Sequence, residues 1–381
     1  MERSGQNKCR EPFESLYKLN LGLSLSGSEA EEAMNNIFKE RNAKKRNSLM
    51  TTLLTGIMIK GPTIEEVHGL LAASLNLDDT LNKKIKVPCN DLIIGVASSG
   101  KKGIKTINIT SAACFVAAAC GVKIAKACSH STSSKTGSSD FLEICGININ
   151  IPFDRKINIL NKHNIAFFSI EETTPKFAQL YGGVFYIPHS MSFGLAGLSF
   201  PIEIDALAYG LSHPNVKLSA EVLKTFGVKN SITYSSTLDE VHYLDEVLPI
   251  GRILSARIKD GHVENTNCMD IENILNIDMK FDINSITERQ DKVANIMESI
   301  KALHGDGDES QINVICVNAA IFLFLAHKVL SLKDGYELAK KQIKNKSAWS
   351  LFIDVLKGYG GDEKRVRRLL RKYQCNRKKV N

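Results

Sequence analysis

The 381-residue chain lacks the cysteine patterns that would indicate a disulfide framework or a zinc site. Its nine cysteines are scattered, with no C-x-x-C pair and no Cys/His cluster at zinc-ligand spacing. Scattered cysteines are typical of reduced thiols, so we expect a cytoplasmic protein. The N-terminus is polar and charged, and it lacks the apolar core of a signal peptide.

Long apolar runs are also missing. Residues 314–325 form the one run that resembles a membrane span, but they are too few to cross a bilayer and predict a buried helix instead. The net charge of +8 is local, because residues 364–381 carry nine Lys or Arg and no acid, while residues 1–363 have 40 basic and 41 acidic side chains. We therefore expect a solvated basic tail, no membrane partner and no general nucleic-acid-binding surface.

The first part of the chain has no strand-like pattern. Residues 13–85 have helical apolar spacing throughout, so we expect an all-helical N-terminal lobe. Ser28-x-x-Glu31 and Thr63-x-x-Glu66 both fit capping boxes at the starts of helices. The length of the whole chain leaves room for a second, larger lobe.

Residues 105–146 contain two hydroxyl-rich turns, each followed by an apolar helical run. The predicted helices are Ala112–Cys120 and Asp140–Cys145, with a strand at Val122–Ala127 between them. A helix start leaves backbone N–H groups unpaired and carries partial positive charge, so it favours anions. Two starts in succession predict a ligand with phosphate at both ends, and Lys126 would add a cation. Ordinary helix capping by Ser and Thr is the alternative for either turn alone.

Two segments of this region, NITSAACFVAAACGVKIAK and SSKTGSSDFLEICG, resemble the anthranilate phosphoribosyltransferase family. The family's pattern is N-I-S-T-A-x-A-F-V-A-A-A-x-G, then K-H-G-N-R-x-x-S-x-x-S-G-S-A-D-x-L-E-x-L-G. LTGIMIKGPTIEEVHGL and VNAAIFLFLAHKVLSLKDGYELAKKQI resemble further family segments, so the likeness extends from residue 13 to about residue 357. It implies an α/β fold, with a small helical lobe and a larger lobe whose central sheet is flanked by helices, as in nucleoside phosphorylases.

The resemblance also implies a division of the chain and an activity. Residues 1–85 would make the contact of a homodimer, residues 86–360 would bind phosphoribosyl pyrophosphate, and residues 361–381 would be the basic tail. The expected reaction is magnesium-dependent transfer of the 5-phosphoribosyl group to a small aromatic or nitrogen-containing acceptor, with release of pyrophosphate. Such catalysis depends mainly on positioning and on stabilising the leaving group.

A glycine loop is the first part of the implied donor site. Gly95 stands at the start of the family's G-T-G-G-D, but the loop here is longer and has no aspartate. Gly95, Gly100 and Lys101 also match the start of a nucleotide P-loop, which we exclude because Lys102 and Gly103 follow where Ser or Thr and a helix are needed. The residues expected to bind phosphoribosyl pyrophosphate are Gly95, Ser98, Ser99, Gly100, Lys101, Thr106, Asn108, Thr110, Ser111, Lys126, Ser129, Ser131, Ser133, Ser134 and Ser138.

The resemblance also implies a magnesium site. Thr110 replaces the family's magnesium-ligating serine, and Asp245 with Glu246 matches its G-L-D-E-x-S-P-x-G. Adjacent carboxylates suit Mg²⁺, which binds one or two carboxylates plus substrate phosphates. Asp239 and Glu240 are the alternative pair, and a D-E pair on a solvated surface is the alternative for either.

The residues expected to bind the acceptor differ from those of the family. The family's H-G-N-R is A-C-S-H at residues 127–130, and no arginine occurs from residue 156 to 251, where the family pairs one with the anthranilate carboxylate. A buried carboxylate without a partner is costly, so we expect an acceptor other than anthranilate. Candidate acceptor contacts are Ser129, His130 and His189, although His189 has a purely structural alternative.

Lys126 and His130 are the candidate catalytic residues, with His130 as general base because it would lie beside the ribose. Four other interpretations stay open. They are a true anthranilate phosphoribosyltransferase with a replaced acceptor site, a nucleoside phosphorylase-like enzyme, a non-catalytic descendant that binds ligand without turnover, and a nucleic-acid-binding role of the basic tail.

Overall fold

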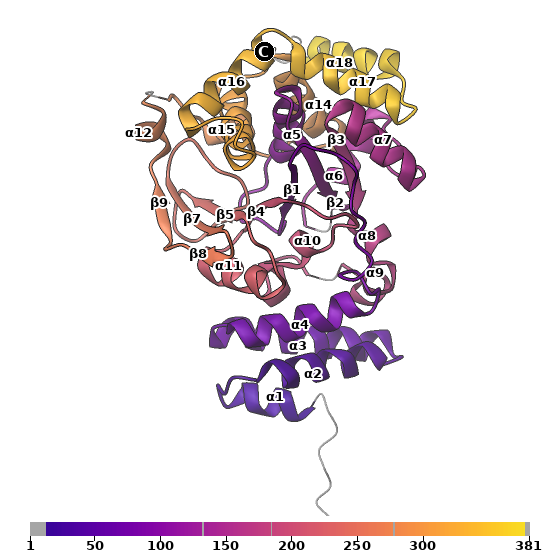
Figure 1. Cartoon of the computed structure of the whole chain (residues 1–381), viewed down its shortest axis with the longest axis vertical. Coiled ribbons are helices and arrows are strands. Elements are labelled where there is room, and N and C mark those ends of the chain that lie inside the picture. Colours follow the sequence, from indigo (N-terminus) through magenta and orange to yellow (C-terminus); the bar gives the residue numbers. More distant parts are fainter. Residues whose placement is uncertain (1–12, 132, 184, 277–278, 378–381) are drawn as a thin grey trace, which may run out of the picture.

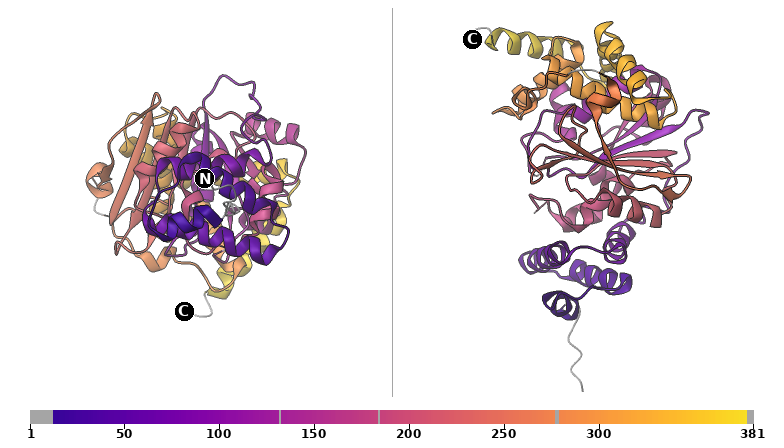
Figure 2. Two further views of the ribbon diagram at one scale, coloured as in Figure 1. Left: turned by 90° about the horizontal axis from the view of Figure 1, so that it is seen from below. Right: turned by 90° about the vertical axis from the view of Figure 1, so that its left-hand side faces the viewer.

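The computed structural model describes residues 13–131, 133–183, 185–276 and 279–377, and it confirms the predicted α/β architecture (Figure 1). Within these residues, a helical N-terminal lobe lies at one end of an elongated molecule, and a nine-stranded sheet with helices on both faces forms the rest. The C-terminal helices cover the sheet face that points away from the N-terminal lobe (Figure 2).

The N-terminal lobe begins each of its longer helices with a side-chain cap. Thr63 and Glu66 form the predicted capping box of the fourth helix. The box of the second helix lies at Ser26 and Glu29, two residues before the predicted position, because Ser26 has the extended backbone of a cap whereas Ser28 already lies inside the helix. The helices of the lobe are α1 (Phe13–Asn20), α2 (Gly27–Lys39), α3 (Ala43–Lys60) and α4 (Ile64–Asn76).

Helices α2 and α4 cross at Gly69, where the two backbones approach closely. A Cβ atom on Gly69 would lie 2.1 Å from the carbonyl oxygen of Gly27. We expect Gly69→Ala to lower the free energy of unfolding by about 3 kcal/mol, because the helices must separate. Gly56→Ala in α3 is the matched control, since its Cβ would meet only the Leu19 side chain at 3.4 Å or beyond. Urea denaturation of both variants tests this, and equal stability losses would contradict it.

The strands of the sheet follow the order β3-β2-β1-β4-β5-β7-β8, with β6 paired to β5 and β9 paired to β7. The five strands from β3 to β5 in this order are parallel, so their carboxyl ends share one edge. Asp260 and Gly261 have positive φ and form the turn between β7 and β8. The strands are β1 (Ile93–Ser98), β2 (Lys123–Cys128), β3 (Ile165–Ser169), β4 (Ala206–Gly210), β5 (Ser231–Thr237), β6 (Tyr243–Leu244), β7 (Arg252–Lys259), β8 (His262–Val263) and β9 (Asn267–Met269).

The sheet separates two apolar cores. One core lies between the sheet and the helices around α5, α14, α15 and α17. The other joins the opposite sheet face to the N-terminal lobe, α11 and the segment from α9 to α10. The remaining helices are α5 (Ile109–Ala119), α6 (Ser138–Cys145), α7 (Phe153–His163), α8 (Ile170–Thr173), α9 (Pro175–Tyr181), the 3₁₀ helix η1 (Ser190–Phe193), α10 (Leu195–Leu198), α11 (Val216–Thr225), α12 (Ile271–Leu275), α13 (Ile283–Ile286), α14 (Lys292–His304), α15 (Glu309–Leu325), α16 (Leu332–Lys344), α17 (Ser347–Gly358) and α18 (Glu363–Arg377).

The apolar run at residues 314–325 lies within α15 and is mostly buried, as predicted. Among the described residues, no single helix is long and apolar enough to cross a membrane, and α14 with α15 passes that test only as a bent pair. The described part of the predicted basic tail is α18, which buries Val366 and Leu370 and packs on α14 and α17. Residues 378–381 lie outside the described residues.

Candidate active site

A cavity of about 280 Å³ lies at the carboxyl edge of the parallel strands. The loops after β1 and β2, the start of α5, the segment from α9 to α10 and the loop after β6 all line it. Every residue predicted to bind substrate or metal lines this cavity except Gly95. The chain segments that carry them are far apart in sequence, so the fold itself brings the predicted site together.

Gly95 is a correction to the predicted donor site. It lies inside β1, paired with residues of β2 and β4, and a Cβ atom there would lie 2.5 Å from Ile204 and 3.1 Å from Phe200. Side chains packed on the sheet, and not the cavity, surround this glycine. Strand β1 ends at Ser98, three residues after Gly95, and Ser98 is the first residue of this segment that lines the cavity.

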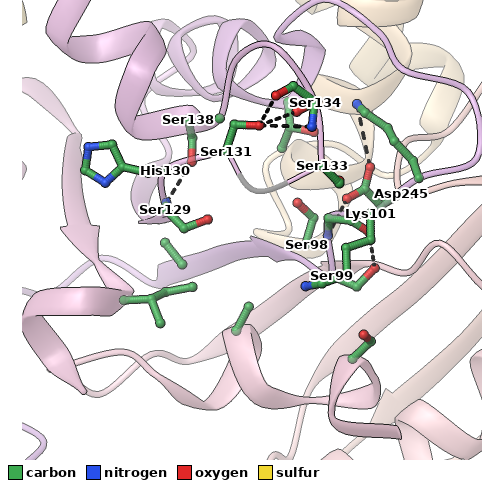
Figure 3. Close-up of a pocket in the computed structure, with 18 of the residues that line it drawn as sticks. Ser98, Ser99, Lys101, Ser129, His130, Ser131, Ser133, Ser134, Ser138 and Asp245 are labelled. Carbon is green, nitrogen blue, oxygen red and sulfur yellow. Dashed lines mark hydrogen bonds and ion pairs between the residues drawn. The ribbon is translucent and has the colours of Figure 1, made fainter. Parts of the chain in front are cut away.

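The loop after β1 is tied to the loop that carries the acid pair. The backbone N–H of Gly100 donates to Oδ2 of Asp245 at 2.9 Å. The side chain of Ser99 accepts a hydrogen bond from the N–H of Ser212 at 2.9 Å, which links β1 to the end of β4. Figure 3 shows Ser98, Ser99 and Asp245 grouped on one side of the cavity, across from the serine turn that contains Ser131.

Asp245 and Glu246 form a buried carboxylate pair, as the family register predicted. Their side chains are 4% and 3% exposed, and Lys102 from the loop after β1 contacts both, at 3.7 Å from Asp245 and in a short ion pair with Glu246. The alternative pair lies on the surface, where Asp239 binds His242 and does not line the cavity. The structure thus places the predicted pair, and not the alternative, at the cavity.

Burial and the charge of Lys102 act in opposite directions on the pKa values of this pair. Burial raises the pKa of Glu246, and neighbouring Asp245 raises it further while Lys102 offsets part of the effect. Burial acts in the same direction on Asp245, but the charge of Lys102 and the N–H of Gly100 hold its pKa below the usual range. Asp245 is therefore the member of the pair that stays ionised, and a bound cation would favour the ionised form of Glu246 as well.

The residues that could hold Mg²⁺ are these two carboxylates and Thr110, whose hydroxyl belongs to the start of α5 on the same cavity. Oε2 of Glu246 is buried and has no hydrogen-bond partner. No cluster of three or more His, Cys, Asp or Glu side chains that could hold a metal occurs among the described residues. The donor set therefore fits a hard cation whose coordination is completed by water or phosphate oxygens.

The first hydroxyl-rich turn leads into α5, which starts three residues earlier than predicted, at Ile109. Thr110 and Ser111 are buried at this helix start. The side chain of Asn108 is already hydrogen-bonded within the protein. It donates to the Gly137 carbonyl at 3.2 Å and accepts from Thr136 at 3.0 Å. Its role in the structure is to join the two turns.

Lys126 is a buried cation at the carboxyl end of β2. Its side chain is 3% exposed, and Nζ donates to the carbonyl oxygen of Ala127 at 2.7 Å. It forms no ion pair with any described residue. An ammonium that is buried without a counter-charge is costly, so its position on the cavity indicates an anionic ligand.

The second turn is more self-contained than the sequence suggested. Oδ2 of Asp140 accepts the N–H groups of Ser131 at 3.0 Å and Gly137 at 2.8 Å. The N–H of Ser129 donates to Ser138 at 3.2 Å. An internal carboxylate thus holds two N–H groups of this turn, and the hydroxyl groups of the turn form much of its cavity surface.

The structure gives His130 a peripheral position. It lies at the rim of the cavity, with its side chain 53% exposed and its Nε2 atom 3.0 Å from Glu143 of α6. Figure 3 shows its ring on the far side of the serine turn from Asp245. The role of His130 as general base stays a prediction, because the ring lies at the rim and only its Nε2 is engaged by Glu143.

An aromatic group closes the other end of the cavity. Tyr181 stacks with Phe185, whose ring centre lies 4.5 Å from that of His189. His189 is buried, its Nε2 lies 2.6 Å from the Tyr181 hydroxyl, and its Nδ1 has no partner. Burial, and to a lesser degree the charge of Lys101, lowers the pKa of His189 well below its usual value. His189 is therefore a neutral polar group at this end.

Lys101 places a cation over the same aromatic group. Its Nζ atom lies 5.9 Å from the ring centre of Tyr181. Burial lowers the pKa of Lys101 to about 8, although the charge of Asp245 offsets part of this effect. The residue has a φ of 58°, which brings a side chain of the donor loop toward the acceptor end.

Several cavity residues were missed by sequence reasoning as parts of the site. Lys102 was considered in the exclusion of a P-loop and not among the predicted site residues, yet it binds the acid pair. Lys105 was not considered, and its Nζ donates to Ser133 at 3.1 Å and to the carbonyl of Lys102 at 2.7 Å. Asp140, which organises the serine turn, matches the aspartate of the family's S-G-S-A-D, and that signal could have identified it.

Comparison with known proteins agrees with this geometry. Residues 90–349 match the family model described as glycosyl transferase family, a/b domain. An anthranilate phosphoribosyltransferase of Shewanella sp. is 29% identical over 346 residues, which cover 88% of this chain and 94% of that protein. The enzyme of the same name from Methanococcoides burtonii is 25% identical over 350 residues, which cover 91% and 94%.

Solved structures show the same fold. Anthranilate phosphoribosyltransferase from Thermus thermophilus superposes with a TM-score of 0.70 at 20% identity, over 91% of this chain and 99% of that one. The enzyme from Saccharomyces cerevisiae, solved in complex with phosphoribosyl pyrophosphate and Mg, gives a TM-score of 0.70 at 16% identity, over 91% and 97%. The chain belongs to the glycosyl transferase family, and within it to the anthranilate phosphoribosyltransferase type that its sequence resembles.

Proposed function

We propose that the protein transfers a 5-phosphoribosyl group from phosphoribosyl pyrophosphate to a small aromatic or nitrogen-containing acceptor, with Mg²⁺ as cofactor. One observation carries the proposal. A single cavity combines a buried acid pair, the start of α5 and the unpaired ammonium of Lys126. A magnesium-bound diphosphate needs all three kinds of partner, because it presents both metal and phosphate oxygens.

The residues divide the work of such a reaction between them. Asp245 and Glu246 would hold the cation, which when bound would neutralise the charge that develops on departing pyrophosphate. Lys126 and the N–H groups at the start of α5 would bind phosphate oxygens and fix the donor. The aromatic end would hold the acceptor against the exposed face of the sugar, so that positioning supplies much of the rate.

The direct test measures pyrophosphate release from phosphoribosyl pyrophosphate with a panel of acceptors, with and without Mg²⁺. We expect release that depends on both the acceptor and the metal. Phosphate-dependent release of a free base from nucleosides, with no response to phosphoribosyl pyrophosphate, would select the phosphorylase alternative. Calorimetric binding of the donor without turnover on any acceptor would select the non-catalytic alternative.

Anthranilate itself is the second candidate acceptor. The lack of arginine from residue 156 to 251 argues against it, but Lys101 favours it, because its ammonium reaches the aromatic end where a carboxylate would need a partner. If Lys101 has this role, the KM for anthranilate should rise as the pH increases through about 8, where the lysine loses its charge.

Two variants make this pH dependence specific. Lys101→Met should raise the KM for anthranilate about tenfold or more at pH 7 and remove the rise near pH 8. Lys101→Arg should keep a low KM to higher pH, because the guanidinium stays charged. A pH profile that is the same in wild type and Lys101→Met would exclude Lys101 as the carboxylate partner.

We also propose that the N-terminal lobe forms the contact of a homodimer. Its outer surface exposes apolar side chains, with Leu21 77% and Ile59 83% exposed. Apolar groups of this size on a small lobe favour burial against a second copy. Light scattering should give twice the chain mass, and Leu21→Glu with Ile59→Glu should reduce it to a single mass.

A further inference from the structure

Lys102 lies where a cation bound by the acid pair would lie. Its ammonium contacts both Asp245 and Glu246, and it also hydrogen-bonds to the Thr106 hydroxyl. The lysine side chain is 15% exposed, so it shares the burial of the two acids. The chain therefore carries its own positive charge at the position where the proposed function requires a metal ion.

The loop fixes this lysine from both sides. Before it, the N–H of Gly100 donates to Asp245 at 2.9 Å. After it, the N–H of Gly103 donates to the carbonyl of Tyr243 at 2.8 Å, and a Cβ on Gly103 would lie 2.7 Å from His242. Both anchors lie on or beside the strand and loop that carry the acids. The contact of Lys102 is therefore built into the backbone path and is not a chance surface ion pair.

We propose that Lys102 is a tethered competitor of the divalent cation. In the free protein its ammonium occupies the position between Asp245 and Glu246, so a metal ion alone binds weakly. Diphosphate oxygens in the cavity offer the lysine a second anionic partner, and its movement to them frees the carboxylates for the metal. This inference rests on the proposed function, since it assigns an order to metal and diphosphate binding at the same site.

The physical reason is competition between two cations for the same pair of carboxylates, since Lys102 contacts Oδ1 of Asp245 and Oε1 of Glu246. Opposite charges attract more strongly in partly buried surroundings than in water, so a hydrated ion must displace a well-held ammonium before it can bind. A tethered ammonium also has a high local concentration that a free ion must exceed. Metal and diphosphate should therefore bind cooperatively, each strengthening the other by the same factor.

The test measures Mn²⁺ binding by electron paramagnetic resonance in the absence of any phosphoribosyl donor. Mn²⁺ serves as a paramagnetic substitute for Mg²⁺. Wild type should bind Mn²⁺ weakly, and Lys102→Met should bind one ion per chain about tenfold or more tightly. Inorganic pyrophosphate should strengthen Mn²⁺ binding strongly in wild type and much less in Lys102→Met. Because no transfer reaction is measured, failure of this test is distinct from failure of the proposed function.

Two controls keep the result specific. Lys123→Met removes a lysine charge at the opposite end of β2, where Lys123 pairs with Asp91 and does not contact the acid pair, and should change Mn²⁺ affinity less than threefold or so. Lys102→Arg keeps the competing charge, so its Mn²⁺ affinity should stay at or below that of wild type even if Lys102→Met folds poorly. Equal Mn²⁺ affinity in wild type and Lys102→Met, or tighter binding in Lys102→Arg, would overturn the proposal.

Discussion

Replacing Asp245 and Glu246 together with Asn and Gln should lower magnesium-dependent turnover by about a thousandfold, or about 4 kcal/mol. The amides keep the size and the hydrogen-bond acceptors but lose the charges that would hold the metal. Stability should fall less, by about 2 kcal/mol, because Lys102 loses its ion pairs but remains 15% exposed to water. Turnover against Mg²⁺ concentration and urea denaturation measure the two effects.

The surface acids Asp239 and Glu240 provide the matched control. They form the second Asp-Glu pair of the same segment and bind His242 and Arg252 outside the cavity. The double change Asp239→Asn with Glu240→Gln should leave turnover within about threefold of wild type, because exposed ion pairs contribute little. Metal dependence that is unchanged in the first double variant, or lost in the second, would show that the cation binds elsewhere.

Lys126→Met should lower kcat/KM for phosphoribosyl pyrophosphate by about a hundredfold or more, the usual size of losing a charged contact to a transferring group. The stability of the folded protein should not decrease, because methionine fills the same buried space and no acid is left without its partner. The variant should melt at or above the temperature of wild type. Steady-state kinetics with thermal melting tests both statements.

Lys123→Met is the control for this variant. Lys123 is another buried lysine of β2, but it lies at the opposite end of the strand, where it pairs with Asp91 and donates to the Asn161 carbonyl. Its replacement should leave kcat/KM near the wild-type value and should lower stability instead. If both lysine variants lose activity equally, Lys126 affects activity by maintaining the structure of β2 and not by contacting the substrate.

The parts of the fold that sequence predicted are those with local signals. Apolar spacing and the family segments located the helical lobe and the buried helix at residues 314–325. The acid pair was located by its D-E-x-x-P context, and Thr63 with Glu66 by a three-residue spacing. Each of these features depends on residues that are neighbours in the chain, so the interaction that causes it can be identified from the sequence.

The contacts that sequence reasoning missed join distant segments. Lys102 meets Glu246 across 144 residues, and no local pattern distinguishes it from Lys101. The positive φ of Lys101 directs its side chain toward the acceptor end of the cavity, whereas the side chain of Lys102 points toward the acid pair. The prediction that Gly95 binds the donor was wrong for a related reason. Its neighbours, Ile204 and Phe200, come from another part of the chain.

The division of the molecule into two cores has a consequence for how its specificity can change. The aromatic residues Phe177 and Phe185 belong to the core shared with the N-terminal lobe, whereas Val247, next to the acid pair, belongs to the other core and is clamped by Asn318 of α15. Substitutions in the helical lobe can therefore reshape the pocket for the nucleophile while leaving diphosphate recognition intact. A lineage with this architecture can exchange one co-substrate while its handling of the activated sugar is conserved.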